Sequence, residues 1–153
     1  MPVMTGSKFF AEAMKAYGVT HVFFMPTIII PAMAAMEDMN IRRVTTHGEK
    51  AAAYMADGYA RASHRPGICL AQNVGAANLA AGLRDAFLAN SAVIALTGGA
   101  DLESRYRHVY QEIEDFSMFD PVTKLNVEVE KVERLPDLIR QAFRTATTGT
   151  PGP

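Results

Sequence analysis

The sequence of 153 residues has a single cysteine and no tryptophan. One thiol, Cys69, excludes a disulfide within the chain and favours a reducing, cytoplasmic location. Apolar runs stay well short of the roughly 18 residues that cross a membrane. The opening MPVMTGSKFF lacks the charged start and apolar core of a secretory signal. We therefore expect a cytoplasmic protein without a membrane partner.

An excess of charge of either sign is also missing. Lys and Arg number 15 and Asp and Glu number 16, which gives a net charge of −1. Without a basic excess, the chain is not expected to bind nucleic acid. The spacings of metal ligands, of the G-x-S-x-G nucleophile elbow, of the P-loop and of the G-x-G-x-x-G dinucleotide fingerprint are absent as well. We predict no metal site formed by this chain alone.

Apolar periodicity and glycine punctuation predict helices and strands that alternate along the chain. Such alternation with short connections is typical of an α/β fold, and we expect one three-layer α/β/α domain over residues 1–153 with a mostly parallel sheet. The ending TTGTPGP stops where a further strand is expected, so the domain is predicted to be truncated and to lack its last strand. Helices are expected at 7–17, 32–39, 50–63, 77–90 and 135–147, and strands at 19–25, 41–46, 68–71, 92–97 and 124–129.

In parallel sheets of this kind, ligands meet the loops at the carboxyl ends of the strands. The loops expected there are 26–31, 47–49, 72–77 and 98–112. Small residues in the loop 72–77 would let a ligand approach the backbone at a helix N-terminus. The alanine-rich helix 51–62 is expected to pack tightly within the domain or across a subunit interface.

Glu49 is the residue with the strongest chemical interpretation. It follows an expected strand and turn, and it opens a helix whose next residues are Lys50, Ala51, Ala52 and Ala53. The helix N-terminus favours a carboxylate, while the alanines solvate it poorly, and this combination suits a carboxyl group that shares a proton with a ligand nitrogen. From the local sequence alone, a glutamate that only stabilises its helix is the commoner case.

Two other candidates have ordinary structural interpretations. His47 at the end of a strand could touch a ligand, although most histidines in such loops are partly exposed and without a role. Cys69 lies within an apolar strand pattern and is expected to be inert core.

Several segments in the same order resemble the thiamine-diphosphate-dependent enzymes of the acetolactate synthase type. These segments are Y-G-V-T-H-V-F at 17–23, E-K-A-A-A-Y-M-A-D-G-Y-A-R at 49–61, I-A-L-T-G at 94–98, Y-Q-E at 110–112 and P-V-T-K at 121–124. The resemblance implies the N-terminal, pyrimidine-binding domain of that family. It also implies that Glu49 hydrogen-bonds N1′ of the cofactor aminopyrimidine and activates it.

The resemblance assigns roles to further residues. Glu49 is the implied catalytic residue, Pro26, Gly75 and Asn78 join it as implied cofactor-binding residues, and Gln111 and His47 lie on the implied substrate side. The chain departs from the family pattern in its loops. Residues 24–28 read F-M-P-T-I instead of G-x-P-G-G, residues 73–75 read N-V-G instead of G-P-G, and a glycine separates the histidine from the glutamate.

The resemblance also implies what the chain would need around it. Family members hold the diphosphate of thiamine diphosphate and Mg²⁺ with a domain that carries a G-D-G…N motif, and this motif is absent here. The implied partners are a second copy bound through this domain, a diphosphate-binding domain or chain, and a small 2-keto acid. Two alternatives stay open: a natural subunit of a two-chain sulfopyruvate- or phosphonopyruvate-type decarboxylase, and a non-catalytic flavodoxin-like binding or assembly module.

Overall fold

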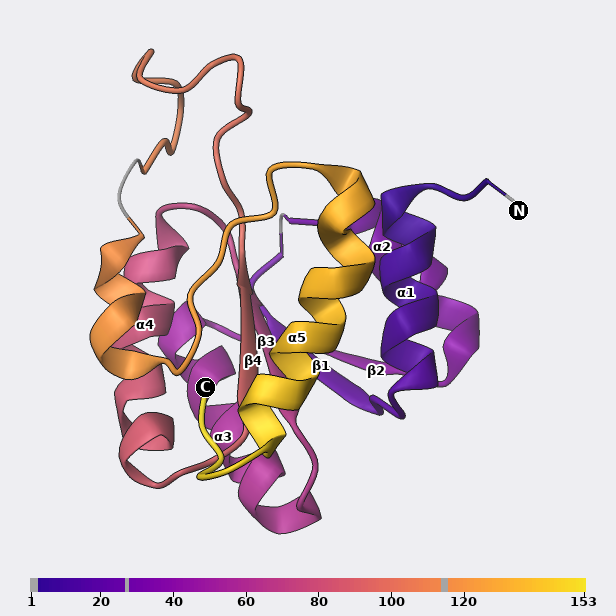
Figure 1. The fold of residues 1–153 in the computed structure, drawn as a ribbon, viewed down its shortest axis with the longest axis vertical. Coiled ribbons are helices and arrows are strands. Elements are labelled where there is room, and N and C mark those ends of the chain that lie inside the picture. The colour runs from indigo at the N-terminus through magenta and orange to yellow at the C-terminus, as the bar shows by residue number, and fades with distance from the viewer. Residues whose placement is uncertain (1–2, 27, 114–115) are drawn as a thin grey trace.

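Among the described residues, four short strands form one parallel sheet at the centre of the fold, in the order β2-β1-β3-β4. The computed structural model describes residues 3–26, 28–113 and 116–153. The strands are β1 (His21–Phe24), β2 (Arg42–Thr45), β3 (Gly67–Ala71) and β4 (Val93–Thr97). The α-helices are α1 (Gly6–Ala16), α2 (Ile30–Ala35), α3 (Glu49–Ser63), α4 (Gly75–Leu88) and α5 (Leu135–Thr147), and short 3₁₀ helices are η1 (Glu37–Met39), η2 (Ser117–Val122) and η3 (Val132–Arg134) (Figure 1).

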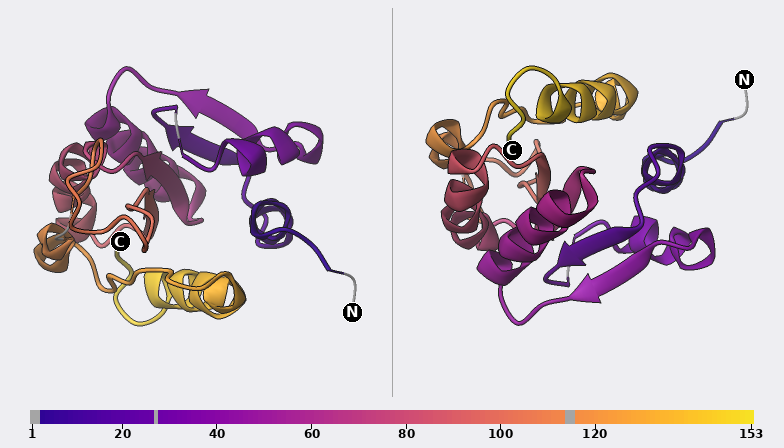
Figure 2. Two further views of the ribbon diagram at one scale, coloured as in Figure 1. Left: turned by 90° about the horizontal axis from the view of Figure 1, so that it is seen from above. Right: turned by 90° about the horizontal axis from the view of Figure 1, so that it is seen from below.

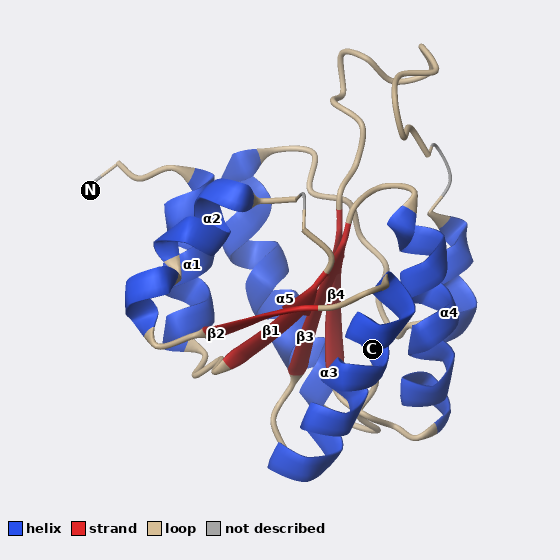
Figure 3. Cartoon of the chain, turned by 180° about the vertical axis from the view of Figure 1, so that it is seen from behind, coloured by secondary structure: helices blue, strands red, loops and turns tan. Residues whose placement is uncertain are grey.

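Alternating side chains of the strands divide the core between the two faces of the sheet. In β3, Ile68 and Leu70 pack with α1, α2 and α5, whereas Cys69 and Ala71 pack with α3, α4 and η2. All of these side chains are buried, which is why the strand reads as a continuous apolar run. The two groups of helices lie on opposite faces of the sheet (Figures 2 and 3). The predicted three-layer α/β/α fold is therefore confirmed.

Small residues let α3 and α4 approach each other closely. Ala52, Ala53 and Ala56 of α3 are fully buried. Gly82 of α4 faces them, and a Cβ atom on Gly82 would lie only 2.7 Å from the Cβ of Ala53. The tight packing expected for the alanine-rich helix is thus found within the domain.

The ends of α1 follow the local sequence signals. The Thr5 hydroxyl accepts a hydrogen bond from the amide of Lys8 at the N-terminus. Gly18 has a φ of 70°, and its amide donates to the carbonyl of Lys15 just beyond the C-terminus. A left-handed residue at this place favours glycine, so the stop signal was readable from the sequence.

The strand expected at 124–129 was wrong. Its alternating apolar residues do not pair with β4, and Val127 and Val129 stay 46% exposed. The amide of Lys124 instead donates to the carbonyl of Pro153, at 2.7 Å. A groove of about 580 Å³ runs between the end of β4 and this segment. Within the described residues, β4 therefore has one edge without a neighbouring strand.

Other boundaries differ by a few residues. The second helix, expected at 32–39, ends at Ala35 and continues as η1, and the fourth begins at Gly75, two residues before the start of its expected range. None of the described helices has the length and apolar character needed to pass through a membrane.

The packing of α3 on α4 predicts opposite effects for the same substitution at two helical glycines. Gly82→Ala should destabilise the fold by about 1–3 kcal/mol, because the new methyl group collides with α3. Gly58→Ala should stabilise it by about 0.5–1 kcal/mol, because no atom lies within 4 Å of the new Cβ and alanine loses less chain entropy in a helix. Urea unfolding in dilute solution measures both. A neutral Gly82→Ala would contradict the close approach of the two helices.

Candidate functional site

The loops at the carboxyl ends of the strands meet at one edge of the sheet, as expected. Gly98 follows β4, and a Cβ atom on it would lie 2.2 Å from Oδ1 of Asn73, which follows β3. The same Cβ would lie 3.1 Å from Cγ2 of Ile28, in the loop after β1. The absence of a side chain at Gly98 therefore lets the three loops pack together at this edge.

Glu49 is placed by a short turn that Thr46 holds. Thr46 is buried, its amide donates to the carbonyl of Phe24 at 2.9 Å, and its hydroxyl donates to the carbonyl of Gly48 at 2.9 Å. The same Gly48 carbonyl accepts the amide of Ala52, which is an early hydrogen bond of α3. The turn is thus anchored to β1 and to the helix at once, and Glu49 becomes the first residue of α3. The sequence reasoning missed Thr46, whose signal is a threonine directly after a strand.

The Glu49 carboxylate lies against the N-terminal turn of α4. Asn78 donates a hydrogen bond from Nδ2 to Oε2 of Glu49, at 3.2 Å. A Cβ atom on Gly75 would lie 2.5 Å from Oε1 of Glu49, so only glycine leaves room for the carboxylate in this position. The carboxylate is half-buried and lies at the N-terminus of its own helix and beside that of α4, and both helix ends favour negative charge.

The other candidate residues do not take part in this contact. Pro26 and His47 are exposed, and Thr27 lies outside the described residues. Gln111 is half-buried, and its Oε1 atom is buried without a hydrogen-bond partner among the described residues. No hydrogen bond joins any of these residues to Glu49 in the part of the chain that the structure describes.

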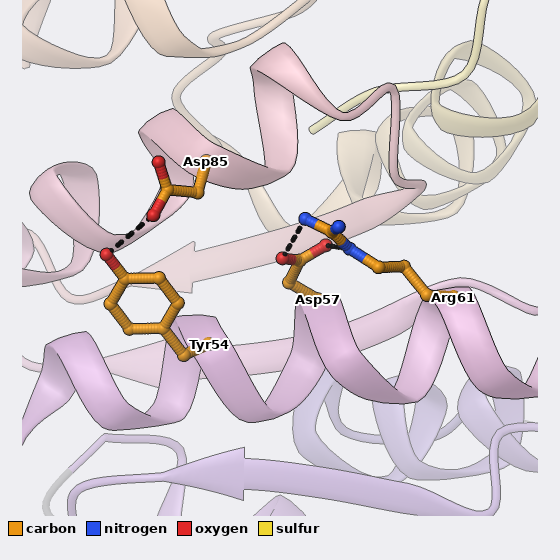
Figure 4. Close-up of polar contacts among 4 residues, drawn as sticks. All are labelled: Tyr54, Asp57, Arg61 and Asp85. Carbon is orange, nitrogen blue, oxygen red and sulfur yellow. Dashed lines mark hydrogen bonds and ion pairs between the residues drawn. The ribbon is translucent and has the colours of Figure 1, made fainter.

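One polar contact joins α3 to α4, and another links two residues of α3 (Figure 4). The hydroxyl of Tyr54 donates to Asp85 at 2.8 Å, and this hydrogen bond raises the pKa of Tyr54. Arg61 donates from Nε and Nη2 to the two oxygens of the buried Asp57. Burial raises the pKa of Asp57, but the hydrogen bonds and the charge of Arg61 outweigh it, so that the pKa lies below its ordinary value. These contacts link α3 to α4 and pair the charge of Asp57, and none of them involves Glu49.

The one cysteine and the possible metal ligands were also located. Cys69 is fully buried in β3, and desolvation raises its pKa to about 12. The described residues contain no group of three or more His, Cys, Asp or Glu side chains that could hold a metal ion. The arrangement that remains is the Glu49 carboxyl group, held on one side by the side-chain amide of Asn78.

Comparison with known proteins gives the same family that the motifs resemble. Residues 4–118 match the family described as thiamine pyrophosphate enzyme, N-terminal TPP binding domain. The chain is 39% identical over 152 residues to a probable acetolactate synthase large subunit of Methanocaldococcus jannaschii. The matched region covers 98% of this chain and 26% of that protein.

Two further relatives carry similar names. The chain is 35% identical to the acetolactate synthase isozyme 2 large subunit of Escherichia coli, over 98% of this chain and 28% of that protein. It is 36% identical to the chloroplastic acetolactate synthase of Arabidopsis thaliana, over 97% of this chain and 22% of that protein. The chain thus spans about a quarter of the length of these relatives.

The environment of Cys69 predicts a thiol that does not react in the folded chain. With a pKa of about 12, the thiolate fraction at pH 8 is about 10³-fold below that of a free cysteine. Reaction with a disulfide reagent such as DTNB should therefore be slow in native buffer and fast in denaturant. Rapid reaction of the native chain would contradict the placement of Cys69 in the core.

Proposed function

Because the chain belongs to the thiamine pyrophosphate enzymes, through their N-terminal TPP binding domain, we propose that it forms the pyrimidine side of a thiamine-diphosphate site. The parent activity that we propose is a 2-keto-acid decarboxylase or carboligase of the acetolactate synthase type. The names of its relatives support this type over a two-chain decarboxylase. Residues 1–153 would then be one pyrimidine-binding domain.

The observation that carries the proposal is the contact among Glu49, Gly75 and Asn78. The Oε2 atom of Glu49 is occupied by the amide of Asn78. Its Oε1 atom lies over Gly75 and has no hydrogen bond to any other described residue. One oxygen is therefore held by the protein, and the other is left for a ligand. Such an arrangement fits a nitrogen acceptor such as N1′ of an aminopyrimidine.

Glu49 would act by holding a proton at N1′. Its half-buried position strengthens a hydrogen bond to a ligand, and the two helix N-termini let the carboxylate persist after the proton has moved. Asn78 would keep the carboxyl group in one orientation throughout. When bound, thiamine diphosphate supplies a carbon that adds to a 2-keto acid and takes up the electrons released on decarboxylation.

The other candidate residues receive less direct roles. We propose that Gly75 leaves space for the cofactor and that Pro26 shapes the loop beside it. His47 and Gln111 would lie on the substrate side, where an exposed imidazole and a buried amide oxygen are available. The diphosphate and Mg²⁺ would be held by a different domain or chain, since the described residues offer no cluster of metal ligands. A reducing, cytoplasmic setting would suit the single buried thiol.

A protein partner is proposed for the outer face of α3. Ala51, Tyr54, Met55 and Gly58 are exposed at helical spacing, and Met55 keeps 45% of its surface open to solvent. Small and apolar residues along one helix let a second backbone approach closely and exclude water. We propose that this outer face of α3 contacts a second copy of the chain.

The role of Glu49 predicts a large loss of cofactor activation in Glu49→Gln. In the complete enzyme, exchange of the cofactor C2 proton for deuterium should slow by about 10²–10⁴-fold, because the positioned proton donor is gone. Rapid-quench exchange followed by NMR measures this rate. The control is Glu12→Gln, an exposed change on α1 that should leave the rate unaltered. Exchange at the parental rate in Glu49→Gln would remove Glu49 from the mechanism.

The outer face of α3 predicts self-association that Met55→Lys weakens. A buried charge at the contact should raise the dissociation constant by about tenfold or more, or roughly 1.4 kcal/mol. Leu88→Lys is the matched control, since Leu88 is exposed and apolar but lies in the last turn of α4. Light scattering over a concentration series measures both. A monomer at high micromolar concentration before any substitution would rule out this contact.

A further inference from the structure

The segment after β4 is held in a conformation that its residues do not prefer. Figure 1 shows it extending beyond the carboxyl end of the sheet. Tyr106, His108 and Gln111 have φ values of 64°, 53° and 62°, in the left-handed region that favours glycine. Three such residues within six positions persist only where other contacts impose the shape, and they commonly mark functional loops.

One carboxylate provides most of those contacts. Oε1 of Glu112 accepts the amide of Tyr106 at 2.6 Å, and Oε2 accepts the amide of Val109 at 3.0 Å. The amide of Glu112 also donates to the carbonyl of Val109, at 3.0 Å. Hydrogen bonds to an ionised acceptor are about twice as strong as neutral ones. Glu112 thus closes residues 106–112 into a compact loop with both of its oxygens.

The loop closed by Glu112 contains Gln111 next to it in sequence. The Oε1 atom of Gln111 is buried and has no hydrogen-bond partner among the described residues. A buried acceptor without a donor is costly, and the side-chain amide of Gln111 is not held in place by a hydrogen bond from any described residue through this oxygen. The place of this oxygen depends on the left-handed backbone of Gln111, and therefore on the hydrogen bonds of Glu112.

We propose that Glu112 is a positioning residue that fixes the side chain of Gln111, whose amide NH₂ group can donate a hydrogen bond to the keto or carboxylate oxygens of the substrate. The carboxylate need not touch the substrate, because it acts through the shape of the loop. Arg105, directly before this loop, forms an ion pair with Glu128 in the segment after η2. This ion pair holds the N-terminal end of the loop. The inference rests on the proposed function for the substrate-side role of Gln111, whereas the loop closure itself does not depend on it.

The test compares Glu112→Gln, Glu112→Asp and the control Glu103→Gln in the complete enzyme. Glu103 is exposed in the same segment and makes no hydrogen bond or ion pair with the described residues of the loop, so its loss should change nothing. Hydrogen–deuterium exchange of a peptide covering 104–112 reports on the loop directly. Glu112→Gln should expose about two further amides to fast exchange, those of Tyr106 and Val109. Glu112→Asp, which keeps both oxygens, should restore part of the protection.

Steady-state kinetics then separate positioning from folding. In Glu112→Gln, KM for the 2-keto acid should rise about tenfold or more while the C2 exchange rate of the cofactor stays parental, and Glu112→Asp should recover part of the KM. Unchanged exchange of the 104–112 peptide, or faster exchange with an unchanged KM, would overturn the proposal. Failure of the proposed function is distinguished from this, because it would appear as parental C2 exchange in a variant that lacks the Glu49 carboxyl group.

Discussion

The close approach of α3 and α4 is the constraint on which the candidate site depends. Gly75 and Gly82 are seven residues apart, so they lie on the same side of α4 and both face α3. Gly82 admits Ala53, and about two turns earlier on α4 Gly75 admits the carboxylate of Glu49. A side chain at either glycine would push the helices apart or displace the carboxylate. The close packing that builds this face of the core therefore also fixes the position of the Glu49 carboxylate.

This arrangement explains why a carboxyl group can stay half-buried at the edge of an apolar layer. Asn78 holds one oxygen, and the free amides at the two helix N-termini favour its charge. The other oxygen lies against Gly75, the first residue of α4. A group that is positioned by helices is more rigid than one on a loop, and rigidity is what a proton-transfer residue requires.

Much of the fold and part of the site followed from the sequence, because both depend on repeated local patterns. Continuous apolar runs and glycine stops predicted the order of elements, and the residues around Glu49 predicted its place at the start of a helix. The contact of Glu49 with Asn78 and Gly75 was not predicted, because these residues are far apart in the sequence; the family resemblance only named them together as implied cofactor-binding residues. The prediction of a strand at 124–129 was wrong for a physical reason. Its alternation indicates that one face is apolar, but a strand also needs a neighbouring backbone to pair with, and β4 does not provide that pairing among the described residues.

Thr46 and Glu112 were missed because a single side chain that binds nearby amides or carbonyls leaves no periodic signal.

The most direct measurement is a crystal structure of the chain with thiamine diphosphate and with the diphosphate-binding domain or chain that is proposed to complete the site. The account predicts that N1′ of the aminopyrimidine lies within about 2.5–3.2 Å of the Oε1 atom of Glu49, while Asn78 keeps its hydrogen bond to Oε2. An aminopyrimidine that binds elsewhere, with the Glu49 carboxyl group held only by Asn78, would contradict the central claim. In that case Glu49 would only stabilise the start of α3 and its contact with α4.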